Sequence, residues 1–379
     1  MFLCGLWAIS MKSALLCMLK RNPHDHVLYR MRLGELESLA ETAGYTVLER
    51  VIQVRRKEAV DYVFGKGKVD ELKELVDAKG VETTIFYNIL SSKQQYNLEK
   101  YLRVRVIDRY DLTLEIFDLA SVDELSKLQI LWARLVKAFP YRRLGASIKY
   151  KIGREHPSFM SLGEYPYHSS LKALTGEIKK VEERIEKQRV LRMEQLENRK
   201  RLGVPIICIT GYYSAGKTSL FNALTGLNKP IGSKPFTTLS SKYHLSSHSR
   251  QDIFYVDTIG FVNDLDPRLI QAFQLTLNDV TASDLVLLVL DISDPTPIMK
   301  LRLETCQEIL EFLGIDTDRV ILVLNKVDRL LESDVVERFH ALEDNVRVYP
   351  WVLISARERI KLEDLTNMIY EKLRLTCTS

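Results

Sequence analysis

Residues 211–218 read Gly-Tyr-Tyr-Ser-Ala-Gly-Lys-Thr and directly follow an apolar run at 206–210. They match the spacing G-x-x-x-x-G-K-S/T, which is typical of a phosphate-binding loop between a buried strand and a helix. Glycines let such a loop curl so that its backbone N–H groups face phosphate oxygens, and the helix N-terminus adds a positive end. Lys217 is expected to reach the β- and γ-phosphates, and Thr218 to bind Mg²⁺. The stretch therefore predicts an α/β domain of the P-loop class.

A second motif, at 325–328, indicates which base is bound. It reads Asn-Lys-Val-Asp and directly follows the apolar run 320–324. Guanine presents donors on N1 and N2 that the Asp328 carboxylate can accept together, a pair that adenine does not offer. Asn325 can brace the loop and reach the base, while the stem of Lys326 lies along the ring. The pair Ser355-Ala356 is placed to bring a backbone N–H to the O6 acceptor, so the sequence predicts a guanine nucleotide.

Two further segments are expected to sense the γ-phosphate. Asp257 follows the apolar run 253–256 and should hold Mg²⁺ through a water, while the N–H of Gly260 should meet the γ-phosphate. In the loop upstream, Thr238 is the candidate for a second hydroxyl on Mg²⁺, with Thr237 as the alternative.

The residue after Gly260 is Phe261. A Ras-like enzyme carries at this position the glutamine that orients the attacking water. Phenylalanine cannot do so. Slow intrinsic hydrolysis is therefore predicted, with the missing group supplied by a partner or by rearranged backbone.

Apolar runs in the second half of the chain are typical of strands buried on both faces of a parallel sheet. The first half alternates between helical and strand patterns, which predicts a smaller parallel sheet covered by helices. Strands are expected at 206–210, 253–256, 285–290, 320–324 and 351–354, with a closing helix at 362–373, and at 45–54, 83–87 and 104–107, with helices near 33–40, 69–76 and 125–139.

Four segments organise the 379 residues, a length that suggests two or three domains at roughly 100–200 residues each. Residues 1–24 contain no acid and are mostly apolar up to 19, which favours a targeting leader of the mitochondrial type; a secretory segment and a misplaced start are the alternatives. The segments are a leader at 1–24, an α/β domain at 25–150, a loop at 151–170 followed by a long amphipathic helix as a linker to 203, and the P-loop domain at 204–379.

Charge is distributed unevenly along the chain. Residues 1–203 hold 36 Lys and Arg against 27 Asp and Glu, a balance of +9, and the remainder holds 18 against 23, a balance of −5. A basic excess attracts a phosphate-rich partner, although chance division of surface charge is an equal alternative. The five cysteines form no C-x-x-C pair, which indicates a reducing compartment. Outside residues 1–24 no run of about 18 apolar residues occurs, so no membrane span is predicted there.

These motifs resemble the HflX family of ribosome-associated GTPases. The resemblance covers most of the chain after residue 24. It implies a GTPase that binds the large ribosomal subunit and its RNA, rather than DNA, and acts in ribosome splitting, recycling or assembly. It rests on residues 211–218, 236–239, 257–262, 272–277 and 325–328, and on 65–69, 88–98, 106–109 and 127–129.

Motifs and resemblance together predict a complete nucleotide site. Lys217, Thr238 and Gly260 are expected to support hydrolysis, and Thr218, Thr238 and Asp257 to hold Mg²⁺. Residues expected around GTP are Gly211, Tyr212, Tyr213, Ser214, Ala215, Gly216, Lys217, Thr218, Ser219, Phe236, Thr237, Thr238, Asp257, Gly260, Asn325, Lys326, Asp328, Ser355 and Ala356.

The chain departs from the family pattern at two places. Ser214 stands where the family usually has an asparagine associated with potassium-assisted hydrolysis, and the stretch 153–168 has few of the usual glycines. Together with Phe261, Ser214 supports a second hypothesis, a GTP-dependent binding or scaffold protein with little turnover. The leader predicts a mitochondrial location, with the cytoplasm as the alternative.

Overall fold

The computed structural model describes residues 12–152, 166–228, 242–246, 252–258, 260–264, 266–346 and 348–376. The chain divides into two compact units, which are described one at a time. The first comprises residues 1–119 and 134–178, and the second comprises 120–133 and 179–379. Among the described helices, none is long and apolar enough to cross a membrane.

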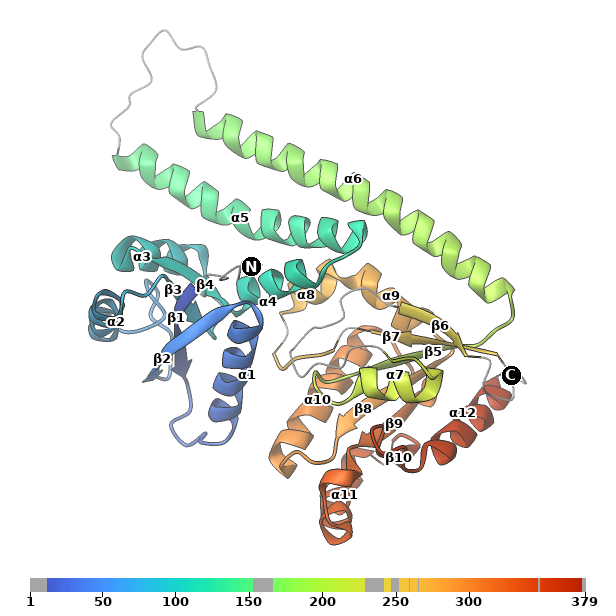
Figure 1. The fold of residues 1–379 in the computed structure, drawn as a ribbon. Coiled ribbons are helices and arrows are strands. Elements are labelled where there is room, and N and C mark those ends of the chain that lie inside the picture. Colours follow the sequence, from blue (N-terminus) through green and yellow to red (C-terminus); the bar gives the residue numbers. More distant parts are fainter. Residues whose placement is uncertain are drawn as a thin grey trace, which may run out of the picture. The chain divides into compact units, whose positions relative to one another are not determined.

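The first unit contains a four-stranded parallel sheet in the order β2-β1-β3-β4, which confirms the small parallel sheet expected from the sequence (Figure 1). Each strand is followed by a helix, as parallel crossovers require. The strands are β1 (Lys12–Lys20), β2 (Tyr45–Val54), β3 (Thr83–Phe86) and β4 (Arg105–Asp108), and the helices are α1 (Leu28–Thr42), α2 (Lys66–Lys79), α3 (Ser92–Leu102) and α4 (Arg109–Ala120).

Strand β1 corrects the expected leader at 1–24. It pairs with β2 on one side and β3 on the other, and residues 14–17 are completely buried. The apolar run reflects burial on both faces of a sheet, and this composition is shared with the apolar part of a targeting segment. The leader assignment is therefore wrong for residues 12–20, while residues 1–11 lie outside the described part of the chain.

Two helices, α5 (Glu124–Ile152) and α6 (Pro166–Arg201), are longer than the sequence pattern predicted. The helix expected at 125–139 continues through Pro140, and the expected loop at 151–170 is helical at both ends, with 153–165 outside the described residues. Within the second unit, the Trp132 indole N–H donates to Glu182 at 2.9 Å. The start of α5 therefore packs beside the middle of α6.

The second unit contains a six-stranded sheet in the order β10-β9-β8-β5-β7-β6. All pairs are parallel except β6 with β7, and every strand expected in this half is present. Its strands are β5 (Ile206–Gly211), β6 (Lys242–Ser246), β7 (Ile253–Asp257), β8 (Leu285–Asp291), β9 (Val320–Asn325) and β10 (Trp351–Leu353).

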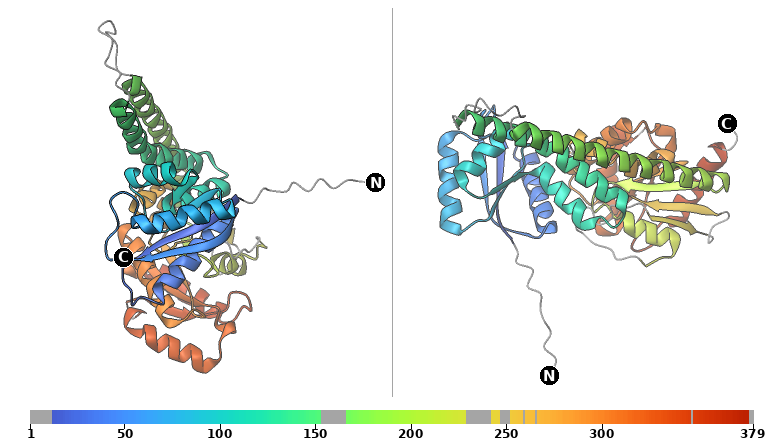
Figure 2. Two further views of the ribbon diagram at one scale, coloured as in Figure 1. Left: turned by 90° about the vertical axis from the view of Figure 1, so that its left-hand side faces the viewer. Right: turned by 90° about the horizontal axis from the view of Figure 1, so that it is seen from above.

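Helices cover both faces of this sheet (Figures 1 and 2). Successive strand residues point to opposite faces, so Cys208 packs with α9, α10 and α11, and Ile209 with α7 and α12. The helices are α7 (Lys217–Thr225), α8 (Pro267–Ala272), α9 (Gln274–Ala282), α10 (Thr296–Phe312), α11 (Glu332–Val346) and α12 (Leu362–Thr376). This architecture brings the carboxyl ends of β5, β7, β8 and β9 to one edge, where α/β sheets bind ligands.

Candidate nucleotide-binding site

The predicted phosphate loop joins β5 to α7, and both of its glycines are required by geometry. Gly211 has φ +137°, and a Cβ there would come within 2.2 Å of the Val289 carbonyl oxygen. Gly216 has φ +98°, and a Cβ there would come within 2.2 Å of Asn325 Nδ2. Larger residues would have to displace β8 or the Asn325 amide. The loop therefore lies tightly between neighbouring strand ends, and α7 begins directly after its second glycine.

Lys217 is the first residue of α7 and is almost completely buried. Its ammonium donates to the Tyr212 carbonyl at 2.8 Å, within the phosphate loop. Burial lowers the pKa of Lys217 to about 8, with Asp257 opposing the shift. Gly260 is adjacent, because a Cβ on it would lie 2.7 Å from Lys217 Nζ. The structure thus brings together the two residues expected at the γ-phosphate.

Oxygen donors suited to Mg²⁺ meet at the ends of β7 and the phosphate loop. The Thr218 hydroxyl lies 3.4 Å from Asp257 Oδ2, and Asp257 is 1% exposed. A hydroxyl and a carboxylate are the hard ligands that Mg²⁺ prefers, so these two residues fit the ion. The third expected ligand, Thr238, lies outside the described residues, as do Phe236 and Thr237.

Asn325 connects the phosphate loop to the loop after β10. Its Nδ2 donates to the Ala215 carbonyl at 2.9 Å, and its Oδ1 accepts the N–H of Ala356 at 2.9 Å. The bracing role expected for Asn325 is thus seen directly. The N–H of Ser355 donates to the Ile360 carbonyl at 3.2 Å. The N–H groups of both residues from which the contact to guanine O6 was expected are therefore engaged within the protein, which differs from the predicted arrangement.

Lys326 lies across the phosphate loop with φ +70°. Its ammonium donates to the Ser214 carbonyl at 2.6 Å and pairs with Asp291 Oδ2 at 2.5 Å. Asp328 lies in the short 3₁₀ helix Val327–Arg329 and is exposed, so its carboxylate is accessible to a base. Phosphate loop and base-recognition loop are consequently held together by Lys326 as well as by Asn325.

Asp291 is a site residue that none of the sequence motifs includes. Its Oδ1 does accept from the N–H of Ser293 at 2.9 Å and from the Ser293 hydroxyl at 2.6 Å. Its other oxygen holds Lys326. The signal available in the sequence was its position at the end of a buried strand, which the sheet register places beside Asn325.

The segment after Gly260 is tied to the phosphate loop by backbone hydrogen bonds. Phe261 N–H donates to the Gly211 carbonyl at 2.9 Å, and Tyr213 N–H donates to the Phe261 carbonyl at 2.8 Å. The Tyr212 hydroxyl accepts the N–H of Asn263 at 2.9 Å. The Phe261 ring is 2% exposed and lies in the core, and it carries no polar group that could orient an attacking water.

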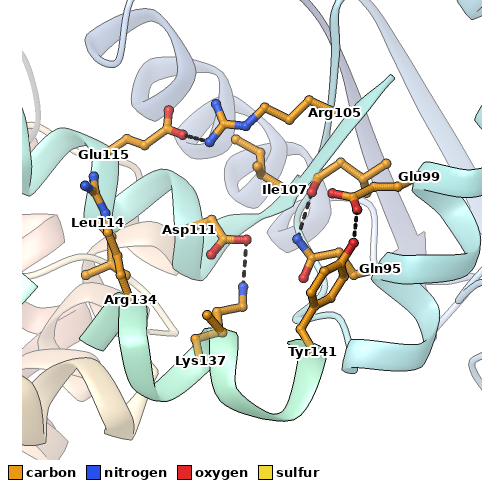
Figure 3. A pocket seen from close by; sticks show the side chains of 12 residues that line it. Gln95, Glu99, Arg105, Ile107, Asp111, Leu114, Glu115, Arg134, Lys137 and Tyr141 are labelled. Atoms are coloured by element: carbon orange, nitrogen blue, oxygen red, sulfur yellow. Dashed lines mark hydrogen bonds and ion pairs between the residues drawn. The ribbon is translucent and has the colours of Figure 1, made fainter. Parts of the chain in front are cut away.

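A separate cavity of about 480 Å³ lies in the first unit, between α3, β4, α4 and α5 (Figure 3). Lys137 pairs there with Asp108 at 2.6 Å and Asp111 at 2.7 Å, and Tyr141 donates to Glu99. Burial, with the neighbouring Asp108 charge, raises the pKa of Asp111 to about 6. Because these charges already pair with one another, the cavity offers less to a nucleotide than the loop at 211–218.

Comparison with known proteins agrees with both units. Residues 30–118 match the family model "GTP-binding GTPase N-terminal", and residues 206–326 match "50S ribosome-binding GTPase". GTPase HflX of Thermofilum pendens is 39% identical over 341 residues, covering 90% of this chain and 80% of the relative. GTPase HflX of Thermococcus kodakarensis is 33% identical over 345 residues, covering 90% and 77%.

A solved complex of SsGBP with GDP has the same fold, with 27% identity and a TM-score of 0.55 over 95% of this chain and 98% of that one. Together with the assembled phosphate and base loops, these similarities establish that the chain belongs to the HflX family of GTPases and hydrolyses GTP.

Proposed function

We propose that this GTPase is a molecular switch whose nucleotide state sets its affinity for the large ribosomal subunit. The main support for a switch is the pair of hydrogen bonds made by Asn325, because this one side chain joins the phosphate loop to the loop at 355–356. Bound nucleotide would thus be sensed at both its ends. Mg²⁺ would be held by Thr218, Asp257 and Thr238, and would neutralise charge on the phosphate oxygens.

Support for a ribosomal partner comes from two sources. The model matched at 206–326 describes 50S ribosome-binding GTPases, and residues 1–203 carry a balance of +9. Ribosomal RNA is a dense array of phosphates, to which basic segments bind with release of counterions. The proposed tasks are ribosome splitting and recycling, or assembly.

Sedimentation with ribosomal subunits tests the proposal. We expect the protein to co-sediment with large subunits when it is loaded with a non-hydrolysable GTP analogue, and much less with GDP. Lys217→Ala, which removes the ammonium at the phosphates, is the control and should abolish the nucleotide dependence. Organellar and cytosolic ribosomes are compared in parallel, because the burial of β1 removes the main sequence argument for a mitochondrial location and leaves both compartments as candidates. Equal sedimentation with both nucleotides would contradict a switch.

A scaffold with little turnover is the second candidate, favoured by the buried Phe261 ring. Since no glutamine orients water at this position, hydrolysis requires a group from elsewhere. Multiple-turnover phosphate release separates the candidates. We expect large subunits to stimulate release by at least roughly tenfold, a modest part of what added catalytic groups achieve in other GTPases. An absence of stimulation would favour the scaffold.

A further inference from the structure

Asp279 is a completely buried carboxylate on α9, outside the nucleotide site. It pairs with Arg192 of α6 at 2.5 Å and accepts the Tyr243 hydroxyl of β6 at 2.8 Å. A buried carboxylate is costly unless its partners stay in place, and removing one partner leaves an uncompensated charge. One side chain therefore fastens three elements that are distant in sequence.

Helix α6 uses one face for this contact. Arg192, Leu196 and Arg199 follow one another at intervals of four and three residues, the spacing of a single helical stripe. Leu196 is 4% exposed, and the Arg199 guanidinium lies 4.0 Å from the centre of the Tyr243 ring. Burial, with the nearby Asp279 charge, raises the pKa of Tyr243, so its hydroxyl keeps the proton that it donates.

The other two elements each follow a segment that the sequence predicts to sense the γ-phosphate. Strand β6 begins after the stretch that contains Thr238, and it pairs with β7, which ends at Asp257. Helix α9 follows the segment at 260–263, and its Leu277 lies in the same core cluster as Tyr212 and Phe261. Loss of a γ-phosphate rearranges such segments in GTPases. A shift of either segment would therefore change the contacts of Asp279.

We propose that Asp279 is a positioning residue that makes the placement of α6 depend on the bound nucleotide. If α9 moved away from α6, the buried Asp279 carboxylate would lose its Arg192 partner, and if β6 moved, it would lose the hydrogen bond from Tyr243, so α6 must follow them. Further along α6, Arg184 pairs with Glu124 at 2.8 Å and Glu182 accepts from Trp132, so the change continues to the start of α5. This coupling requires nucleotide binding but no ribosome, and a failed ribosome experiment would leave it standing.

Hydrogen exchange in the full chain tests the proposal. Amide exchange across residues 190–201 is compared between the GDP form and a form with a non-hydrolysable GTP analogue, after both affinities have been measured. In the wild type, exchange should differ between the two forms. In Asp279→Asn that difference should fall at least roughly threefold, because the charge that holds Arg192 is gone, while nucleotide affinities stay within about twofold.

Two further variants separate coupling from plain stability. Arg192→Met combined with Asp279→Leu replaces the buried pair with apolar groups, which preserves folding in comparable cases, and it should also lose the difference. Arg189→Gln breaks the exposed pair with Glu186 on the same helix, and this variant should retain the difference in exchange between the two nucleotide forms. Two results would overturn the proposal. One is a difference in exchange between the GDP and GTP-analogue forms that stays as large in both Asp279 variants as in the wild type. The other is identical exchange of the two nucleotide-bound forms of the wild type.

Discussion

Lys217 is a cation whose burial favours loss of its proton. Its pKa of about 8 lies below the ordinary value of a lysine, because the site is desolvated before nucleotide binds. Nucleotide phosphates favour the charged ammonium, so above pH 8 binding must take up a proton. We expect the Kd of GDP to be flat below about pH 7 and to rise by up to about tenfold per pH unit above pH 8.

Nucleotide titrations between about pH 6.5 and 9.5 measure this profile. Lys217→Arg is the control, because a guanidinium keeps its charge over the whole range. The variant also reports any effect from titration of the nucleotide itself. A wild-type profile parallel to that of the arginine variant would show that Lys217 does not titrate in this range.

Asp291 acts on the base-recognition loop through Lys326. Asp291→Asn should weaken the pairing with the Lys326 ammonium, which is worth about 1.5–3 kcal/mol for a hydrogen bond to a charged group. We expect Kd for GDP and for GTP to rise alike, by about tenfold, with kcat within about twofold, because the γ-phosphate contacts are untouched. Isothermal titration and multiple-turnover phosphate release measure the two quantities.

The neighbouring carboxylate provides the matched control. Asp294 pairs with Arg302 instead of Lys326, so Asp294→Asn should leave guanine-nucleotide affinity within about threefold of the wild type. A selective loss of GTP affinity in Asp291→Asn, with GDP affinity retained, would place Asp291 at the γ-phosphate side and contradict the assignment.

Residue types and spacing predicted most of the site, and what they missed depends on three-dimensional neighbours. Lys217, Asp257 and Asn325 were found because each follows a buried strand in a known motif. The role of Asp291 could not be read from the sequence, since it requires knowing that β8 lies beside β9. The engagement of the Ala356 N–H by Asn325 likewise depends on how two loops meet.

The sequence predicted most accurately those strands that are buried on both faces. β8 and β9 are continuous apolar runs, and both were expected within one residue of their observed ends. Strand β6 was missed because it lies at the sheet edge and reads Lys-Tyr-His-Leu-Ser, a short mixed pattern. Strand β1 was misread for the opposite reason, since its uninterrupted apolar run is also what a targeting segment contains.

Strand β1 is expected to be essential for the four-stranded sheet. Deleting residues 1–24 removes the strand that pairs with both β2 and β3, so the four-stranded sheet should not form. We expect amides of β3 and β4 to lose most of their protection against hydrogen exchange. Deleting residues 1–11 is the control, because it leaves β1 intact. Equal protection in the two truncated chains would show that β1 is dispensable.

Charge distribution acts on the scale of the whole molecule. The +9 balance of residues 1–203 is separate in sequence from the −5 balance of the GTPase half, so binding to RNA and binding to nucleotide should respond differently to salt. Each phosphate contact made by a Lys or Arg releases counterions, and the loss of affinity with salt grows with the number of such contacts.

Salt titration measures this difference. Between about 50 and 200 mM salt, we expect affinity for large ribosomal subunits to fall by at least roughly a hundredfold, as several phosphate contacts would require. GTP affinity, which depends on a buried lysine and backbone N–H groups, should change by less than about threefold, since buried charges are weakly screened. Neutralising variants of exposed lysines on α6, such as Lys179→Gln with Lys180→Gln, should lower the salt slope by about two if both contact RNA. A ribosome affinity as insensitive to salt as GTP affinity would mean that contacts with ribosomal protein, rather than RNA phosphates, hold the complex together.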